Sequence, residues 1–367
     1  MALALKKDIA ASWSIGPSEP AIKTWDLRAL GGRTVLREHQ GHNPSVQIDR
    51  NGALAASTAV SNEGWSLRVW NLGTGVLAAH LDGGRGALCV SGDCRSALSW
   101  GTRGLLAWNT ITGAATVLEG DKGGPIAFAL SYDGRRALTS TDGGKLLCWE
   151  VPERRFRVLA SRDVNRVAIS PDGTIGACLS KQGWLCAWNL DTLEVVGRIE
   201  VPFDGSLTLG GGGELAMVEA FSETAVCNLG SGALDRLQEP HLASTALSAN
   251  AGLAAIGFGV RLRLWGCRER KVLCEIPVLS PHPEYPTNAV YRLQVSDDGK
   301  YVASLSEDRA LRVFDTSGRE LAIFTSESRF FAVDIAWAKR RIVAIDFLGR
   351  IHYLSLENCP PVGRPRS

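Results

Sequence analysis

Short apolar runs alternate with polar residues along the whole chain, and one arrangement returns at a nearly constant spacing. Each copy has two or three apolar residues, then usually an aromatic residue, then an acid, amide or turn residue, as in Leu67–Leu72, Leu146–Glu150 and Leu311–Asp315. The aromatic position falls at 25, 70, 108, 149, 188, 227, 265, 314 and 354, a mean step of about 41 residues. Strand-like units with a fixed period of roughly 40–45 residues are typical of a β-propeller.

Tight-turn residues recur in step with these runs. Asn51-Gly52, Asp133-Gly134, Asp172-Gly173 and Asp298-Gly299 each lie between two short apolar runs. Asn, Asp and Gly tolerate positive φ, which two-residue hairpin turns require. Two markers with one period indicate a repeating unit of four strands, called a to d from the ring axis outward. We therefore predict an all-β chain that forms a single closed β-propeller of four-stranded blades.

The number of blades is open at this stage. The repeat divides residues 1–359 into nine units, and residues 360–367 form a tail rich in Pro and Arg. Nine third strands make nine blades the direct count. Eight is the alternative, in which Thr34–Arg37 would close the last blade and residues 1–30 would form an appended hairpin. The units are 1–42, 43–83, 84–124, 125–163, 164–203, 204–241, 242–288, 289–329 and 330–359.

Phrases such as Asp133–Ser140, followed by the strand that ends at Trp149, resemble the tryptophan–aspartate (WD) repeat β-propellers, especially the bacterial type. The resemblance covers about residues 2–356. A Trp-Asp pair occurs only at Trp25-Asp26 and a Gly-His pair only at Gly41-His42. The family's polar network of Asp, His, Ser/Thr and Trp is therefore incomplete, so apolar packing must hold the blades. The resemblance implies a domain that binds proteins.

Composition narrows the setting. The net charge of +2 favours neither nucleic acid nor an anionic membrane as a partner. No apolar run approaches the roughly 18–20 residues of a membrane helix, and Met1–Leu5 is too short for a secretory signal. The nine cysteines are an odd number and lie mostly in predicted strands, which suits free thiols in the cytoplasm. Arginine outnumbers lysine, which hints at a bacterial source.

The search for catalytic chemistry finds no constellation. His39 and His42 have a His-x-x-His spacing, but no cysteine or carboxylate nearby completes a zinc set. Gly210–Gly213 lacks the Lys-Ser/Thr of a phosphate-binding loop and falls where other units have their hairpin turn. Accordingly, the sequence predicts no catalytic, cofactor-binding or metal-binding residue.

Three insertions break the repeat, at Ser14–Ala21, Thr58–Ser66 and Pro277–Thr287. The first two lengthen b–c connections and the third a d–a connection, so all three belong to one face. Loops on a rigid scaffold often carry the binding side, although neutral insertion is also tolerated there. Large aromatics at strand mouths serve either local packing or an interface. The candidate partner-binding residues are Trp13, Trp65, Trp100, His282 and Tyr285.

The predicted function is a non-catalytic protein-interaction scaffold or adaptor in the cytoplasm, without a cofactor. Its partners would be proteins rather than nucleic acid or membrane, and it could belong to a larger complex. One alternative is a sensor or recognition component of a bacterial signalling or defence assembly. A second is a catalytic or sugar-binding propeller, for which Glu219 and Asp346 at channel-side strand ends are the candidate carboxylates.

Overall fold

The structure is a computed structural model of the 367-residue chain. Apart from two short 3₁₀ turns, η1 (Gly211–Gly213) and η2 (Trp337–Lys339), the regular elements of the described residues are all strands. The residues described are 2–6, 9–14, 21–26, 42–60, 64–83, 88–101, 104–119, 124–160, 163–202, 205–220, 223–238, 242–278, 289–347 and 351–355.

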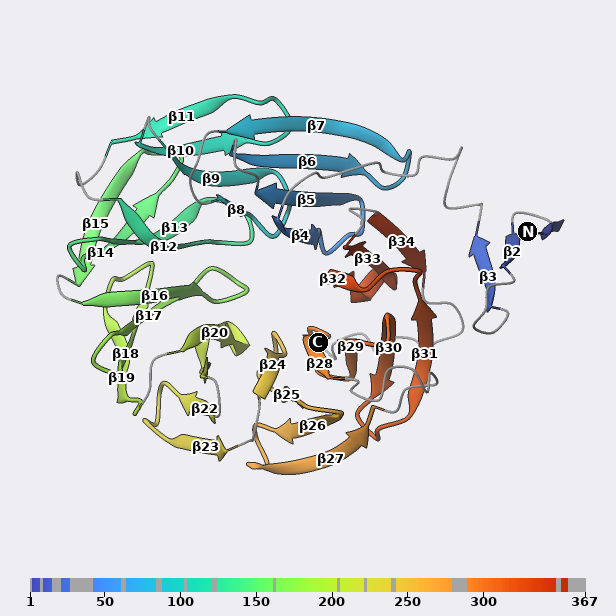
Figure 1. The fold of residues 1–367 in the computed structure, drawn as a ribbon. Coiled ribbons are helices and arrows are strands. Elements are labelled where there is room, and N and C mark those ends of the chain that lie inside the picture. The colour runs from blue at the N-terminus through green and yellow to red at the C-terminus, as the bar shows by residue number, and fades with distance from the viewer. Residues whose placement is uncertain are drawn as a thin grey trace.

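Eight antiparallel sheets stand around a central axis as the blades of a ring (Figure 1). Blade one contains β4 (His42–Ile48), β5 (Leu54–Val60), β6 (Trp65–Asn71) and β7 (Val76–Gly83). Blade two contains β8 (Leu88–Val90), β9 (Ser96–Gly101), β10 (Gly104–Asn109) and β11 (Ala115–Leu118). Blade three contains β12 (Pro125–Leu130), β13 (Arg136–Thr141), β14 (Leu146–Glu150) and β15 (Arg155–Ala160). Blade four contains β16 (Val164–Ile169), β17 (Ile175–Ser180), β18 (Trp184–Asn189) and β19 (Val195–Glu200).

The second half of the ring repeats this order. Blade five contains β20 (Ser206–Gly210), β21 (Leu215–Glu219), β22 (Glu223–Asn228) and β23 (Leu234–Gln238). Blade six contains β24 (Leu242–Leu247), β25 (Leu253–Phe258), β26 (Arg261–Gly266) and β27 (Lys271–Pro277). Blade seven contains β28 (Val290–Val295), β29 (Tyr301–Ser306), β30 (Ala310–Asp315) and β31 (Glu320–Thr325). Blade eight has three described strands, β32 (Phe330–Ala336), β33 (Arg341–Asp346) and β34 (Ile351–Ser355).

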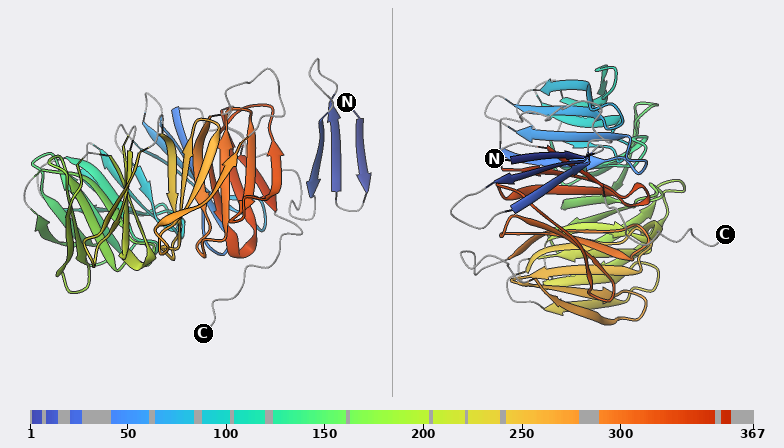
Figure 2. Two further views of the ribbon diagram at one scale, coloured as in Figure 1. Left: turned by 90° about the horizontal axis from the view of Figure 1, so that it is seen from below. Right: turned by 90° about the vertical axis from the view of Figure 1, so that its right-hand side faces the viewer.

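The nine-blade count is wrong, because the first repeat unit does not join the ring. Its strands β1 (Ala2–Lys6), β2 (Ile9–Ser14) and β3 (Ala21–Asp26) pair only with one another, as a separate three-stranded sheet. Figure 2 shows this sheet standing beside the ring. Eight blades is therefore correct, although Thr34–Arg37, the segment expected to close the last blade, lies outside the described residues.

The core lies between neighbouring blades, not inside any one of them. One apolar cluster joins Leu179 and Leu185 of blade four to Val218 and Leu229 of blade five, and other junctions have similar clusters. Second strands carry small buried residues, as at Ala55, where the blade narrows towards the axis and a bulkier side chain would overpack.

Blade eight closes the ring by direct contact with blade one. The backbone N–H of Ile48 donates to Asp334 Oδ2 at 2.8 Å, and Arg341 Nη1 donates to the carbonyl oxygen of Gly52 at 2.8 Å. Ile48 also packs in one apolar cluster with Ala336 and Val343 of blade eight. Closure thus rests on hydrogen bonds and apolar contacts between the two ends of the ring.

Side-chain hydrogen bonds from tryptophan join strands inside blades one, two and three. The indole N–H groups of Trp70, Trp108 and Trp149 donate to Ser57, Ser99 and Thr139 at 3.2, 2.8 and 2.9 Å. Each bond ties the third strand of a blade to its second strand.

Blade seven has a different internal bond. Its Arg312 donates to Ser306 Oγ at 2.7 Å and forms a buried ion pair with Asp308. The hydrogen bonds from Arg312 and Ser306 lower the pKa of Asp308 even though burial opposes this shift. The charge of Asp308 is therefore stabilised where water cannot reach it.

Candidate protein-interaction face

The ring has two faces with different connections. We call the side that carries the b–c and d–a connections, such as Gly259-Val260 and Glu307–Arg309, the loop face. The side that carries the a–b and c–d turns, such as Asp133-Gly134, is the turn face. In every blade the inner strand runs from the loop face to the turn face, so repeat position alone assigns a residue to one side.

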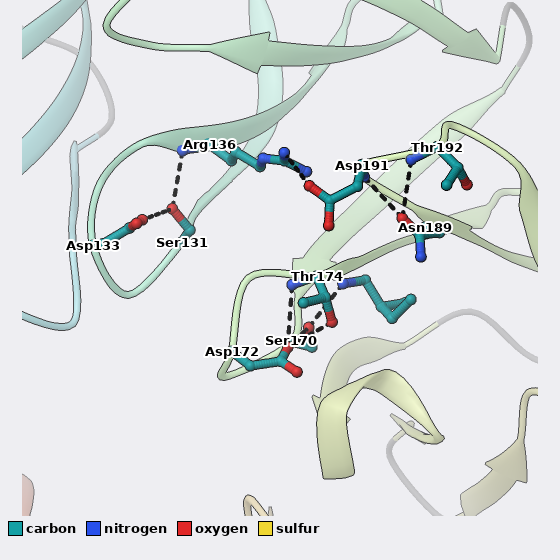
Figure 3. Close-up of polar contacts among 10 residues, drawn as sticks. Ser131, Asp133, Arg136, Ser170, Asp172, Thr174, Asn189, Asp191 and Thr192 are labelled. Carbon is teal, nitrogen blue, oxygen red and sulfur yellow. Dashed lines mark hydrogen bonds and ion pairs between the residues drawn. The ribbon is translucent and has the colours of Figure 1, made fainter.

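The turn face is built from self-satisfied polar turns (Figure 3). In blade three, Ser131 Oγ donates to Asp133 Oδ1 at 2.7 Å and accepts from the N–H of Arg136 at 2.9 Å. Ser170 and Asp172 form the same arrangement in blade four. Although burial opposes it, hydrogen bonds lower the pKa of Asp133, so this carboxylate is charged and already hydrogen-bonded at neutral pH.

The c–d turns on the same face also hold their polar groups within the protein. Asn189 Oδ1 accepts from the backbone N–H groups of Asp191 and Thr192 at 2.8 and 3.1 Å. Asp191 also forms an ion pair with Arg136, which links blades three and four. Turn chemistry of this kind explains why Asp, Asn and Gly recur in the sequence, and it serves folding.

The described part of the loop face carries an aromatic–arginine cluster at blades seven and eight. It consists of Tyr291, Glu307, Arg329, Phe331 and Phe347, which come from the start of β28, the β29–β30 turn, the β31–β32 connection, β32 and the end of β33. The Arg329 guanidinium carbon lies 5.1 Å from the Tyr291 ring centroid and 5.7 Å from that of Phe347. Phe331 and Phe347 are 5.2 Å apart between ring centroids, and Phe347 is 56% exposed.

The cluster is ordered by hydrogen bonds beneath the exposed ring. Tyr291 donates its hydroxyl to the carbonyl oxygen of Phe330 at 2.5 Å. Burial raises the pKa of Tyr291 to about 12, so the phenol stays neutral. Arg329 Nη2 lies 3.3 Å from Glu307 Oε1, which balances its charge. The cluster is a nearly neutral, stacked and partly exposed surface, a composition that protein interfaces favour.

Trp65 is not an exposed anchor as the sequence had suggested. Its side chain is only 3% exposed and packs edge-to-face on Trp108 of blade two, with ring centroids 5.6 Å apart. Gly83 makes this burial possible, because a Cβ atom there would lie 2.1 Å from the Trp65 ring. Trp65 therefore belongs to the core between blades one and two.

The other predicted anchors do not come together. Trp100 is partly buried against the core of blades two and three, and Trp13 occupies β2 opposite Ala2, in the sheet outside the ring. His282, Tyr285 and the central parts of the three insertions lie outside the described residues. β2 and β3 belong to the separate sheet, so the nine-blade order that made them neighbours of β5 and β6 in the ring does not hold.

The exposed Phe347 went unnoticed in the sequence. Trp100 was selected as a large aromatic at the end of a second strand. Phe347 lies one residue beyond the end of a second strand, so the same criterion, extended by one residue, would have found it. Phe331 was not among the sequence candidates; its neighbour Phe330 is fully buried. Strand alternation could have separated them, since successive residues point to opposite sides.

The carboxylates considered for catalysis are hydrogen-bonded within the protein. Asp346 is fully buried and lies 3.0 Å from His352 Nε2, while Glu219 Oε2 accepts from the Thr245 hydroxyl at 2.6 Å. No group of three or more His, Cys, Asp or Glu residues in the described part of the chain could hold a metal ion. Gly211–Gly213 forms the β20–β21 turn, which confirms the hairpin interpretation of the glycine run.

Eight cysteines in the described ranges are free thiols, most of them buried. Burial raises the pKa of Cys178 and Cys227 to about 12 each, so these thiols are protonated at neutral pH. They behave as small apolar core residues. Among the residues that the structure describes, no helix is long and apolar enough to span a membrane.

Comparison with known proteins agrees with this architecture. The model of the family "WD domain, G-beta repeat" matches residues 274–315, which run from β27 to the end of β30. The crystal structure of the C-terminal WD40 domain of Sif2 superposes with a TM-score of 0.62 at 14% identity, covering 86% of this chain and 95% of that one. The crystal structure of the computationally designed Ika8 protein gives 0.65 at 18% identity, covering 86% and 98%.

No curated protein matches the sequence significantly. At identities this low, the two solved structures establish the fold alone. The family model matches one repeat of this chain, so the comparisons show a β-propeller that is similar to WD-repeat proteins.

Proposed function

We propose that this protein is a non-catalytic interaction scaffold that acts in the cytoplasm and binds protein partners through its loop face. WD-repeat propellers generally serve as interaction scaffolds. Of the two carboxylates considered for catalysis, Asp346 is fully buried against His352, and Glu219 accepts a hydrogen bond from Thr245. Free, buried thiols suit a reducing compartment. The excess of arginine over lysine favours a bacterial source.

The observation that carries this proposal is the exposure of Phe347 within an ordered aromatic–arginine cluster. More than half of the Phe347 side chain is exposed, and Arg329 and Phe331 hold its ring in place. A preorganised ring costs little entropy to bind, so a partner gains most of its burial energy. Aromatic and arginine side chains are also the residues most enriched among interface hot spots.

The test compares proteins retained from a cell extract by purified wild-type chain and by two variants. Phe347→Ala should lose a specific partner, because truncation of an aromatic hot spot typically costs at least about 2 kcal/mol, roughly thirtyfold in affinity. The matched control is Ile111→Ala, an apolar residue 41% exposed in the c–d turn of blade two on the turn face. If Ile111→Ala loses the partner and Phe347→Ala retains it, the loop face is not the binding face.

A further inference from the structure

A cavity of about 380 Å³ lies against the inner strands of the first three blades. Its walls come from β4, β8 and β12, which face the centre of the ring in Figure 1, and from β5. The cavity spans the inner strands of blades one to three, and its volume falls in the range of roughly 300–1,000 Å³ typical of small-molecule pockets.

Interlocked turns close the cavity on its turn-face side. Gln47 Nε2 donates to the carbonyl oxygen of Ser91 at 2.8 Å and so bridges blades one and two. The N–H of Arg50 donates to the Tyr132 hydroxyl at 2.9 Å, and the Arg50 guanidinium carbon lies 4.3 Å from the centroid of the Tyr132 ring. Arg50 Nε also reaches across the axis to within 3.7 Å of Asp297 in blade seven. These contacts obstruct entry from the turn-face side.

The lining is polar but uncharged. Ser45 and Thr58 share a hydrogen bond of 2.6 Å between their hydroxyls, and both hydroxyls retain capacity for further bonds. The Gln47 carboxamide adds an acceptor oxygen, and Phe128 adds an aromatic ring. Burial raises the pKa of Cys89 to about 11, so its thiol is neutral at pH 7. The lining residues that the structure describes include no Asp, Glu, Lys, Arg or His.

We propose that this cavity binds an uncharged planar ring compound that carries hydroxyl or amide groups, of the size and chemistry of a nucleoside. A flat ring can stack on Phe128, as bases stack on aromatic side chains. The two hydroxyls and the carboxamide match neutral donors and acceptors. An ionic ligand would meet no opposite charge among the described lining residues, which favours a neutral one. The site is separate from the aromatic–arginine cluster and does not depend on it.

Isothermal titration of the purified full chain tests the proposal with three probes: adenosine, uridine and adenosine monophosphate. At least one nucleoside should bind saturably with one site per chain. The monophosphate has the same ring as adenosine but carries a charge, and it should bind at least about tenfold more weakly. The proposal is overturned if neither nucleoside binds, or if the monophosphate binds as well as adenosine.

Two substitutions locate the binding site. Phe128→Leu keeps an apolar side chain but removes the ring, and it should weaken nucleoside binding by about tenfold or more, the scale of one base–aromatic stack. The control is Val117→Ala on β11, where the side chain is 47% exposed. Unchanged binding by a folded Phe128→Leu protein would show that the ligand lies elsewhere.

Discussion

Replacing Trp65 with alanine removes a side chain shared by blades one and two. The ring is 3% exposed and lies in one apolar cluster with Leu67 and Val69 of its own strand and Ala97 of the next blade. Its edge-to-face contact with Trp108 adds a directional term. A sequence interpretation of Trp65 as a surface anchor expects almost no change in stability. The structure predicts a large one.

The size of the loss follows from the buried area. A buried tryptophan removes roughly 150–250 Å² from water, and at about 25 cal/mol per Å² this area is worth about 4–6 kcal/mol. Partial collapse of the cavity and the smaller area of the unfolded state lower this value. Measured Trp→Ala changes in cores cost about 3–5 kcal/mol, so we expect the free energy of unfolding to fall by about 4 kcal/mol.

Gly83 provides a companion substitution of opposite sense. In the wild type, an alanine Cβ at this position would lie 2.1 Å from Trp65 Cε2 and Cζ2, so Gly83→Ala should cost about 1–3 kcal/mol through overpacking. In the Trp65→Ala background the added methyl group enters vacated space, and the same substitution should be neutral or stabilising. The two changes are therefore non-additive, with a coupling of about 1–3 kcal/mol.

Urea titration of the wild type, both single variants and the double variant measures this cycle, with fluorescence and far-ultraviolet circular dichroism as two probes. Coincident transitions with a common slope would validate the free energies. An unfolding midpoint of Trp65→Ala equal to that of the wild type would refute the burial of the ring. Strict additivity of the two substitutions would refute the contact between Trp65 and Gly83.

Two further predictions concern charged groups in the ring. Burial raises the pKa of Asp334 from 3.8 to about 6, against the hydrogen bond from the Ile48 N–H, so the folded state holds this proton more tightly than the unfolded chain. The free energy of unfolding should therefore fall as pH rises from about 4 to about 6, and Asp334→Asn should remove about 1–3 kcal/mol of that fall. If urea midpoints of the wild type and Asp334→Asn change identically with pH, this reasoning is wrong. Arg312→Leu leaves the buried Asp308 charge without its partner and should lower the free energy of unfolding by about 3–5 kcal/mol. Adding Asp308→Ala to Arg312→Leu removes that charge and should restore part of the lost stability. A double variant that melts at a lower temperature than Arg312→Leu would count against this reasoning.

The sequence repeat predicted the blades. It did not predict which of the repeat units belong to the ring. Hydrophobic periodicity and Asp-Gly turns are local signals, and both report correctly on strands such as β13 and β14. The first unit carries the same local pattern, yet β32 and β33, not β1, pack against β4. The strands that close the ring are determined by contacts between segments far apart in the sequence, and a local pattern carries no information about such contacts.

The candidate site was predictable only in outline. The choice of the loop face came from the position of insertions, and the described aromatic–arginine cluster lies there. Individual anchors failed because exposure depends on the opposite strand: Trp65 is buried only because residue 83 lacks a side chain. Phe347 is exposed because it follows the last residue of β33 and points away from the core. Neither fact can be read from the residue and its neighbours in sequence.

Because blade eight closes onto blade one, the ring can close only near the end of the protein's synthesis. The hydrogen bond from Ile48 to Asp334 spans 286 residues. Blade one therefore leaves the ribosome long before the strands of blade eight that contact it have been synthesised. During that interval the inner edge of β4 and the apolar side chains around Ile48 face the cell without their final partner. Chain elongation at about 5–20 residues per second makes the wait at least about fifteen seconds. Until blade eight is synthesised, the propeller is therefore an open arc, and blade one is the part that most needs protection by a chaperone.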